Sequence, residues 1–263
     1  MMKFSANISM MYGHMPVEEQ FAAAANDGFR YVEILFPYDH SPHWYSQRLK
    51  EHDLQLTLIN TPVFRPEFPL GMAGQIKAAS QFRQAFSATL EVCSQTGCKA
   101  IHVMAGLRDE SLSHQAQQAL LVENLNWAAA QNTDVTLQLE ALNDTDMPNY
   151  FYASPEQVVT VLEQCQAPNI GLQFDFYHVV KQGLHLDEQL QACLPWVRHI
   201  QLAGSPERHE PVLEKDGLLT AFDRLHEAGY TGFVGGEYRP RGQTSEGLGW
   251  MQPLLDKGWI ALA

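Results

Sequence analysis

Short apolar runs alternate along the chain with longer segments in which apolar residues recur every three or four positions. The short runs are typical of strands buried on both faces, and the longer segments are typical of amphipathic helices. Eight strands are predicted, at residues 4–9, 31–36, 54–60, 99–104, 135–140, 170–174, 197–202 and 233–237. The helices predicted between them include residues 17–25, 76–95, 115–130, 155–164 and 218–228.

Glycine, serine and proline residues mark the ends of these helices. Gly28, Gly97 and Gly229 fall just past predicted helix ends, where a left-handed residue commonly closes the last turn. Ser154 precedes Pro155, which places a capping hydroxyl before a proline suited to the first helical position. These capping residues therefore agree with the helix boundaries that the periodicity predicts.

The alternation of strands and helices predicts an α/β fold. Eight such units in a chain of 263 residues fit a single (β/α)8 TIM barrel that spans residues 1–263 as one domain. A doubly wound open sheet also alternates in this way, but it carries a glycine-rich phosphate loop after the first strand, where this chain has ISMMYGH. The barrel is therefore the favoured prediction, with residues 62–74 as a loop over its mouth.

Charge and composition exclude several classes of partner. The chain has 17 Lys plus Arg against 30 Asp plus Glu, a formal net charge of −13, and no basic stretch that could follow a phosphate backbone, so nucleic acid is not expected. No uninterrupted apolar run of about 18 residues occurs, so no membrane partner is expected. We expect a soluble, cytoplasmic protein whose 4 cysteines are reduced, because they are too few and too scattered for a disulfide framework.

Four oxygen-bearing side chains stand at the ends of the last four predicted strands. These are Glu140, Asp175, Gln201 and Glu237. The carboxyl ends of the strands of a barrel meet at one mouth, where three carboxylates would repel one another strongly unless a cation neutralised them. Carboxylate and amide oxygens suit Mg²⁺ or Mn²⁺ better than Zn²⁺ or Cu²⁺. The pattern therefore predicts a divalent metal site.

Each of three other residues near the predicted mouth has two possible roles. His178, three residues after Asp175, either contacts a substrate oxygen or is a loop histidine, and His102 either points into the barrel or belongs to the core. Glu33, inside the apolar strand YVEILF, fits either a structural ion pair or a substrate contact. An apolar mouth around a small substrate is expected from Met10, Met11, Phe36, Phe64, Phe68 and Trp250.

The chain resembles the hydroxypyruvate isomerase family, within the xylose-isomerase-like barrels. The stretches that carry the resemblance run from residue 4 to residue 251 and are FSANISMMYG, GFRYVEILFPYD, HVMAG, LEALN, FDFYH, HIQLAGSPERHEP and GEYRPRGQTSEGLGWM. The resemblance implies a single (β/α)8 barrel that isomerises small hydroxy-oxo acids. Examples are the conversion of hydroxypyruvate to tartronate semialdehyde and of 2-oxo-tetronate to 3-oxo-tetronate.

The same motifs imply roles for individual residues. The two glutamates that exchange the proton fall on Glu140 and Glu237, and the set that binds Mg²⁺ or Mn²⁺ adds Asp175 and Gln201. The implied substrate contacts are His178, Arg208 and Asp146, although Arg208 also fits a solvated loop arginine. The resemblance allows a homo-oligomer, but no stretch of the sequence identifies a contact surface.

Two loops depart from the family pattern, so the resemblance specifies the type of reaction more closely than the acid. TPVFRPEFPLGMAG follows the third predicted strand in place of a segment of the GERG type, and VLEKDG stands in place of GEINY. A ketose 3-epimerase acting on a neutral sugar is an alternative with the same metal and glutamates. A metal-dependent endonuclease, which needs several histidine ligands and a basic groove, and a non-catalytic sugar-acid binding protein are further alternatives.

Overall fold

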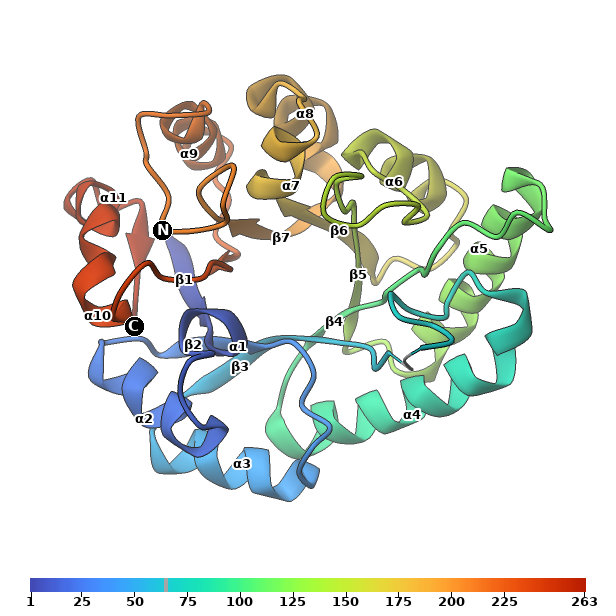
Figure 1. The fold of residues 1–263 in the computed structure, drawn as a ribbon, viewed down its shortest axis with the longest axis horizontal. Helices are drawn as coiled ribbons and strands as arrows, with labels where there is room; N and C mark the ends of the chain where they lie inside the picture. The colour runs from blue at the N-terminus through green and yellow to red at the C-terminus, as the bar shows by residue number, and fades with distance from the viewer. Residues whose placement is uncertain (64–65) are drawn as a thin grey trace.

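The computed structural model describes residues 1–63 and 66–263, and its centre is a closed barrel of eight parallel strands (Figure 1). Each strand pairs with the next in chain order, and β1 closes the ring by pairing with both β8 and β2. The barrel strands are β1 (Met2–Asn7), β2 (Tyr31–Ile34), β3 (Gln55–Asn60), β4 (Ala100–His102), β5 (Thr136–Glu140), β6 (Ile170–Asp175), β7 (Val197–Leu202) and β8 (Phe233–Gly236). The predicted TIM barrel is therefore confirmed.

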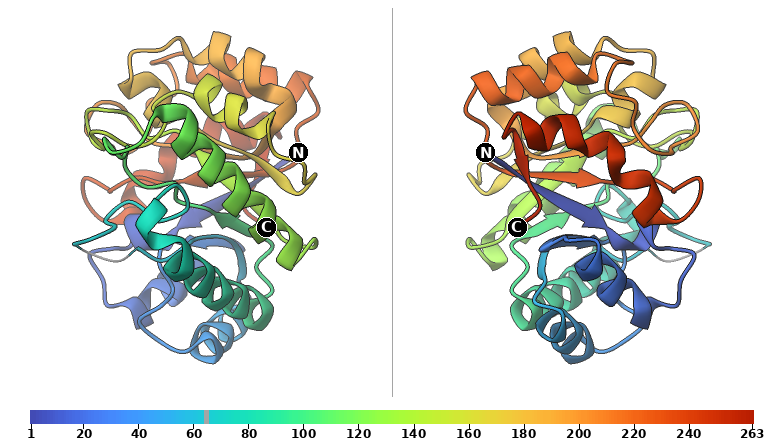
Figure 2. Two further views of the ribbon diagram at one scale, coloured as in Figure 1. Left: turned by 90° about the vertical axis from the view of Figure 1, so that its right-hand side faces the viewer. Right: turned by 90° about the vertical axis from the view of Figure 1, so that its left-hand side faces the viewer.

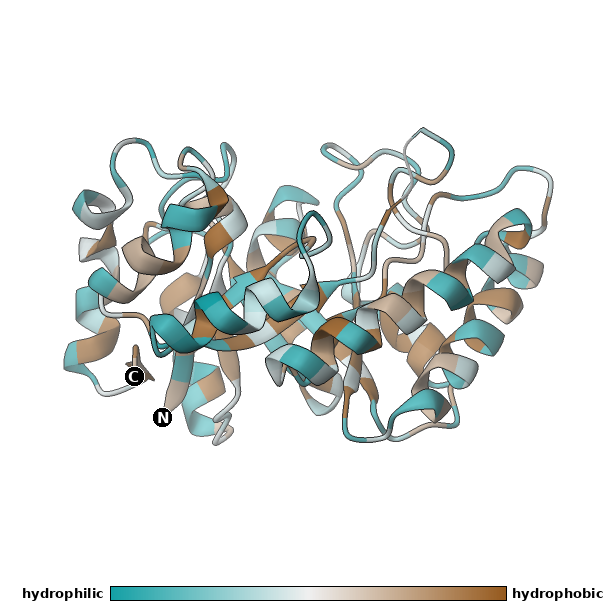
Figure 3. Cartoon of the chain, turned by 90° about the horizontal axis from the view of Figure 1, so that it is seen from below, coloured by the Kyte–Doolittle hydropathy of each residue, from teal (hydrophilic) through white to brown (hydrophobic). Residues whose placement is uncertain are grey.

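Helices form a ring outside the strands (Figures 1 and 2). They are α1 (Ile8–Met11), α2 (Val17–Asn26), α3 (Pro42–Glu51), η1 (Ile76–Ala78), α4 (Ala79–Thr96), α5 (His114–Gln131), α6 (Pro155–Leu162), α7 (Phe176–Lys181), α8 (Leu186–Cys193), η2 (Leu194–Trp196), α9 (Leu218–Glu227), α10 (Thr244–Gly247), η3 (Leu248–Met251) and α11 (Gln252–Asp256). Those in Figure 3 carry both hydrophilic and hydrophobic residues, as helices do that pack one side on a sheet. Among the described residues, no helix is long and apolar enough to cross a membrane.

The predicted helix ends agree with the structure. Gly28, Gly97 and Gly229 all adopt the left-handed conformation. Ser154 and Gln157 form a reciprocal capping box at the start of α6. All four cysteines are free, as expected. The sequence pattern missed β9 (Ile260–Ala261), which pairs with the start of β1, because two residues are too few to show a period.

The interior of the barrel contains a buried carboxylate, Glu33, that settles one open question. Only 1% of Glu33 is exposed, and its Oε1 accepts hydrogen bonds from Ser5 Oγ (2.6 Å) and lies 2.7 Å from His199 Nε2. Its Oε2 accepts a hydrogen bond from Gln201 Nε2 (2.8 Å). Buried charges persist when several donors satisfy them in this way. Glu33 therefore links β1, β2 and β7, and it has the structural role of the two that the sequence allowed.

Gly235 makes room for this carboxylate. It is the register partner of both Ser5 on β1 and Gln201 on β7, so it lies at the same height in the barrel as these two donors to Glu33. A Cβ atom added to Gly235 would lie 2.7 Å from the carboxyl carbon of Glu33, closer than real Cβ contacts allow. A side chain at this position would therefore displace Glu33 from its donors.

We expect Gly235→Ala to lower the free energy of unfolding by about 1–3 kcal/mol, because overpacking would separate Glu33 from its hydrogen-bond donors. Urea denaturation followed by circular dichroism measures the change. Gly249→Ala is the matched control, since a Cβ there meets nothing within 4 Å. Equal stability of the two variants would contradict the proposed fit between Gly235 and Glu33.

Candidate active site

A cavity of about 240 Å³ opens at the carboxyl ends of the strands. Its apolar wall includes Met10, Leu35, Phe36, Leu70, Met104 and Leu142. Its polar wall includes His102, Glu140, His178, Arg208, Glu237 and Arg239. Residues 66–74 contribute Pro69 and Leu70, as predicted for the loop over the mouth.

The apolar mouth predicted from the sequence is only partly correct. Met10 and Phe36 line the cavity, whereas Met11 lies in the hydrophobic core and Trp250 packs edge-on against Phe4. Phe68 is partly buried against the core, and Phe64 lies outside the described residues.

Glu140 and Asp175 occupy the ends of two neighbouring strands, β5 and β6. Glu140 Oε2 accepts a hydrogen bond from Gln173 Nε2 (2.8 Å), and its buried Oε1 has no hydrogen-bond partner in the described part of the chain. Asp175 Oδ1 accepts a hydrogen bond from the backbone N–H of Tyr177 (2.8 Å) and so caps α7. The cap fixes the side chain of Asp175 where the strand turns into the helix.

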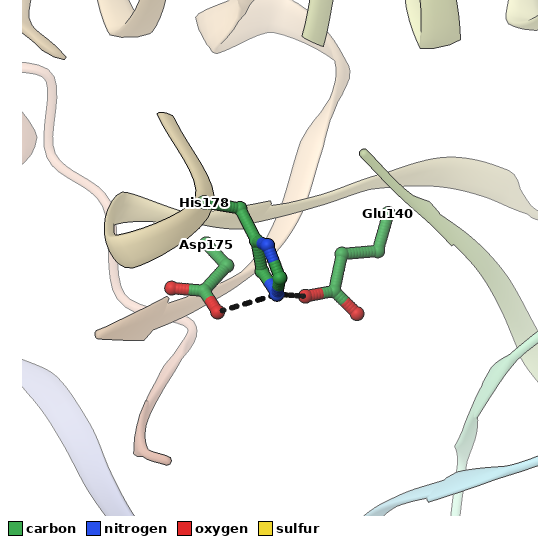
Figure 4. Close-up of side chains that lie close together, drawn as sticks. All are labelled: Glu140, Asp175 and His178. Atoms are coloured by element: carbon green, nitrogen blue, oxygen red, sulfur yellow. Dashed lines mark ion pairs between the residues drawn. The ribbon is translucent and has the colours of Figure 1, made fainter. Parts of the chain in front are cut away.

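His178 lies in α7, with its ring between the two carboxylates (Figure 4). Its Nε2 lies 3.8 Å from Glu140 Oε1 and 3.7 Å from Asp175 Oδ2. Its Nδ1 accepts a hydrogen bond from the backbone N–H of Asn143 (3.0 Å). Burial, aided by Arg208 and His102, holds the pKa of His178 well below its ordinary value. The ring is therefore neutral with its proton on Nε2, and it presents a hydrogen-bond donor to the carboxylates.

Glu237 follows β8 directly, and Arg208 reaches it from the loop between β7 and α9. Glu237 Oε1 accepts a hydrogen bond from Asn7 Nδ2 (3.1 Å), and Glu237 Oε2 accepts one from Arg208 Nη2. The same Nη2 lies 3.4 Å from Asp175 Oδ2. Arg208 has a φ of 60°, a left-handed conformation that is uncommon for residues other than glycine. Its side chain is only 13% exposed, so it is no solvated loop arginine.

The negative charges of Glu140, Asp175 and Glu237 are only partly balanced by nearby positive charge. Burial raises the pKa of Glu140 well above its ordinary value, that of Glu237 to about 8 and that of Asp175 to about 6. Repulsion from neighbouring carboxylates, Glu33 included, adds to these shifts, and Arg208 opposes them. Burial alone would lower the pKa of Arg208, but the adjacent Glu237 and Asp175 raise it overall. Among the described residues, three buried carboxyl groups thus share one buried guanidinium, that of Arg208, and a divalent cation would supply the missing positive charge. Carboxylate oxygens suit such an ion, and ligand atoms of Glu140, Asp175 and His178 all lie within 4.8 Å of one another.

Gln201 lies below the cavity at the end of β7. Its Oε1 accepts a hydrogen bond from Gln173 Nε2 (2.6 Å), the same nitrogen that donates to Glu140, and its Nε2 donates to Glu33. An amide oxygen has two lone pairs, so Gln201 retains one for a metal. The structure thus connects Gln201 with Glu140, and Arg208 connects Asp175 with Glu237.

Asp146 lies apart from the cavity lining, on the loop after β5. It is exposed, and its Oδ2 accepts hydrogen bonds from the Tyr177 hydroxyl (2.6 Å) and from Asn143 Nδ2 (3.1 Å). Burial would raise its pKa, but these two donors lower it overall. In this structure Asp146 fixes the loop that carries Asn143, and its contact with a substrate stays a prediction.

Sequence reasoning missed or left open three residues of the site. Gln173 was detectable, because it stands two positions before Asp175 in the strand IGLQFD and therefore points to the same side of the sheet. Asn7 was missed because the first strand was predicted to continue to residue 9, whereas β1 ends at Asn7. His102 proves to line the cavity, with Nδ1 3.2 Å from Glu140 Oε2, and burial lowers its pKa to about 3.

Comparison with known proteins identifies the family. The family model described as the xylose isomerase-like TIM barrel matches residues 21–254. A 2-oxo-tetronate isomerase from Cupriavidus necator is 37% identical and aligns over 98% of this chain and 100% of that enzyme. The hydroxypyruvate isomerase of Escherichia coli is 30% identical over 96% of this chain and 99% of its own.

A solved structure from Brucella melitensis, described as an AP endonuclease of family 2, has 33% sequence identity and a TM-score of 0.89. It covers 96% of this chain, and this chain covers 99% of it. The resemblance found in the sequence motifs is thereby confirmed: the chain belongs to the xylose isomerase-like TIM barrel family, and within it the chain is an isomerase of the hydroxypyruvate isomerase type.

Proposed function

We propose that this isomerase shifts a carbonyl group between adjacent carbons of a small hydroxy-oxo acid. The reaction is that of hydroxypyruvate with tartronate semialdehyde, or of 2-oxo-tetronate with 3-oxo-tetronate. The observation that carries the proposal is the placement of Glu140 and Glu237 in one cavity. They stand at the ends of β5 and β8, three strands apart around an eight-stranded ring, so they reach a ligand from different sides.

The two glutamates are suited to move protons. One takes the proton from the hydroxyl-bearing carbon, which leaves an enediolate, and the other returns a proton to the neighbouring carbon while the hydroxyl proton passes to the former carbonyl oxygen. A general acid or base works best when its pKa lies near the working pH, and burial shifts both glutamates in that direction. The first proton acceptor is whichever glutamate is ionised when the substrate binds.

Other residues would hold the charge that develops on the substrate oxygens. His178 presents its Nε2–H to the cavity and can donate to an oxyanion, while Arg208 keeps Glu237 in place and contacts the substrate through its remaining donors. A divalent cation, Mg²⁺ or Mn²⁺, held by Glu140, Asp175, Gln201 and Glu237 would add Lewis-acid stabilisation of the enediolate.

The cavity favours a small acid as the substrate. The cavity of about 240 Å³ has room for such an acid, and Arg208 and Arg239 both line it. Two guanidinium groups match a carboxylate better than a neutral sugar. The names of the Cupriavidus necator and Escherichia coli relatives agree with this class.

An endonuclease is disfavoured, although the Brucella melitensis relative carries that description. The chain has a net charge of −13, and DNA binding relies on cationic contacts to phosphates. The predicted ligand set is also built on carboxylates and an amide.

Proton exchange tests the proposal. The purified protein, supplied with Mg²⁺ or Mn²⁺, is incubated in D₂O with hydroxypyruvate, with a 2-oxo-tetronate and with neutral ketoses, and NMR follows the carbon next to the carbonyl. Deuterium at that carbon, together with a shifted carbonyl in the acids, is the expected result. Inversion of a ketose carbon without a carbonyl shift would instead identify a 3-epimerase. Binding of the acids without exchange would identify a non-catalytic binding protein.

Glu237→Gln should lower kcat on the order of 10²- to 10⁴-fold, because the amide cannot exchange a proton. The fold should persist, since the amide retains an oxygen that can accept from Asn7 or Arg208. Steady-state kinetics and circular dichroism measure the two effects. Glu163→Gln, at an exposed position just after α6, is the matched control with unchanged kcat. A near-normal rate for Glu237→Gln at saturating metal would refute the assignment.

Removal of the metal should abolish turnover and lower the melting temperature. Treatment with a chelator would leave the mutual repulsion of the carboxyl groups only partly offset by Arg208. Mg²⁺ or Mn²⁺ at about 100 times its Kd should therefore raise the melting temperature by about 5–10 °C. Differential scanning fluorimetry measures this shift independently of activity.

The metal-induced shift should disappear in Asp175→Asn and persist in Asp134→Asn. Asparagine can still cap α7 but removes one of the three buried carboxyl groups of the site, whereas Asp134 is exposed and does not line the cavity. Undiminished activity of the chelator-treated enzyme would show that the reaction needs no metal.

A further inference from the structure

His102 is a buried residue of the cavity that has no role in the proposed proton transfer. It is the last residue of β4, only 1% exposed, and it lines the cavity. Neither of its ring nitrogens has a hydrogen-bond partner in the described part of the chain. Leaving a buried polar group unpaired is unfavourable by about 1–3 kcal/mol, so an imidazole in this state needs an explanation. A ligand that enters the cavity could supply the missing partner.

The surroundings of the ring determine what that partner must be. Nδ1 lies 3.2 Å from Glu140 Oε2, at an angle that is poor for a hydrogen bond. When Glu140 is ionised, as it would be with a divalent cation bound, a nitrogen lone pair at that distance from its carboxylate oxygen would be repelled, so the proton of the neutral ring then belongs on Nδ1. Nε2 then carries a lone pair and can only accept. Carbonyl and carboxylate oxygens, which are acceptors themselves, do not fit there, whereas a hydroxyl group does.

His102 and His178 flank Glu140 with opposite hydrogen-bonding properties. The backbone N–H of Asn143 fixes His178 with its proton on Nε2, so His178 can meet only an acceptor. We propose that His102 is a substrate-binding residue whose Nε2 accepts a hydrogen bond from a hydroxyl group of the substrate. This inference rests on the proposed function, and it narrows the substrate to molecules with a hydroxyl acting as donor on the His102 side and an oxygen that can accept a hydrogen bond on the His178 side.

Two substitutions separate this role from a merely structural one. In His102→Gln the amide oxygen can take the place of Nε2, so the acceptor is kept. In His102→Asn the amide reaches only the place of Nδ1, so the contact with Glu140 can persist but the acceptor is lost. If His102 binds a substrate hydroxyl, His102→Gln should retain the ligand preference of the wild type better than His102→Asn does. If His102 only positions Glu140, His102→Asn should retain it better.

The ligands for the test are three inert acids, so turnover does not interfere. Glycerate carries two hydroxyls, lactate lacks the terminal one, and 3-hydroxypropionate lacks the one next to the carboxylate. Isothermal titration calorimetry with protein saturated in Mg²⁺ should show that the wild type prefers glycerate about tenfold over one of the two deoxy acids. His102→Gln should keep most of this preference, and His102→Asn should lose it.

A preference for glycerate that is unchanged in His102→Asn would overturn the proposal, as would equal affinities of the wild type for all three acids. A preference retained in His102→Asn but lost in His102→Gln would assign His102 to positioning Glu140 instead. Melting temperatures verify that each variant is folded, and His102→Ala serves as the second truncation if His102→Asn does not fold. Proton exchange by the wild type is measured on the same preparation, so failure of the isomerase proposal is distinguished from failure of this one.

Discussion

Repulsion among three buried carboxyl groups at the carboxyl ends of the strands is the constraint on which the rest of the site depends. Glu140, Asp175 and Glu237 come from different strands of one barrel, so the fold itself forces them together. Arg208 compensates part of their charge, and it does so from a strained backbone conformation. Repulsion of this kind destabilises the folded protein when no cation is bound, so the site favours binding of a cation. It also shifts the pKa values of the glutamates toward the range in which they can transfer protons.

The groups beneath the cavity hold this arrangement in place. Gln173 joins Glu140 to Gln201, and Gln201 continues the chain of hydrogen bonds to Glu33. Each residue along this path comes from a different strand, so a shift of one strand would break bonds to its neighbours. Because these strands are held rigidly in the barrel, the hydrogen-bond network fixes the positions of the side chains above it.

Much of the fold and part of the site were predictable from the sequence. Periodicity found all eight barrel strands, because each lies within an apolar run of the sequence, and it missed β9, which has two residues. Strand ends located Glu140, Asp175, Gln201 and Glu237 because position along a parallel strand determines which end of the barrel a residue faces. Hydrogen-bond partners were not predictable. The pairing of Arg208 with Glu237 and the tautomer of His178 depend on loop conformations that no local pattern encodes.

The pairing of β9 with the start of β1 has a practical consequence. Met2 is the register partner of Ile260, which brings both ends of the chain to the amino-terminal rim of the barrel, opposite the end where the strands deliver Glu140 and Glu237 (Figure 2). Barrel enzymes keep chemistry on one rim and stability on the other. Affinity tags, fluorophores or surface attachment at either terminus therefore leave the entrance for ligands clear, which suits immobilised formats and single-molecule measurements.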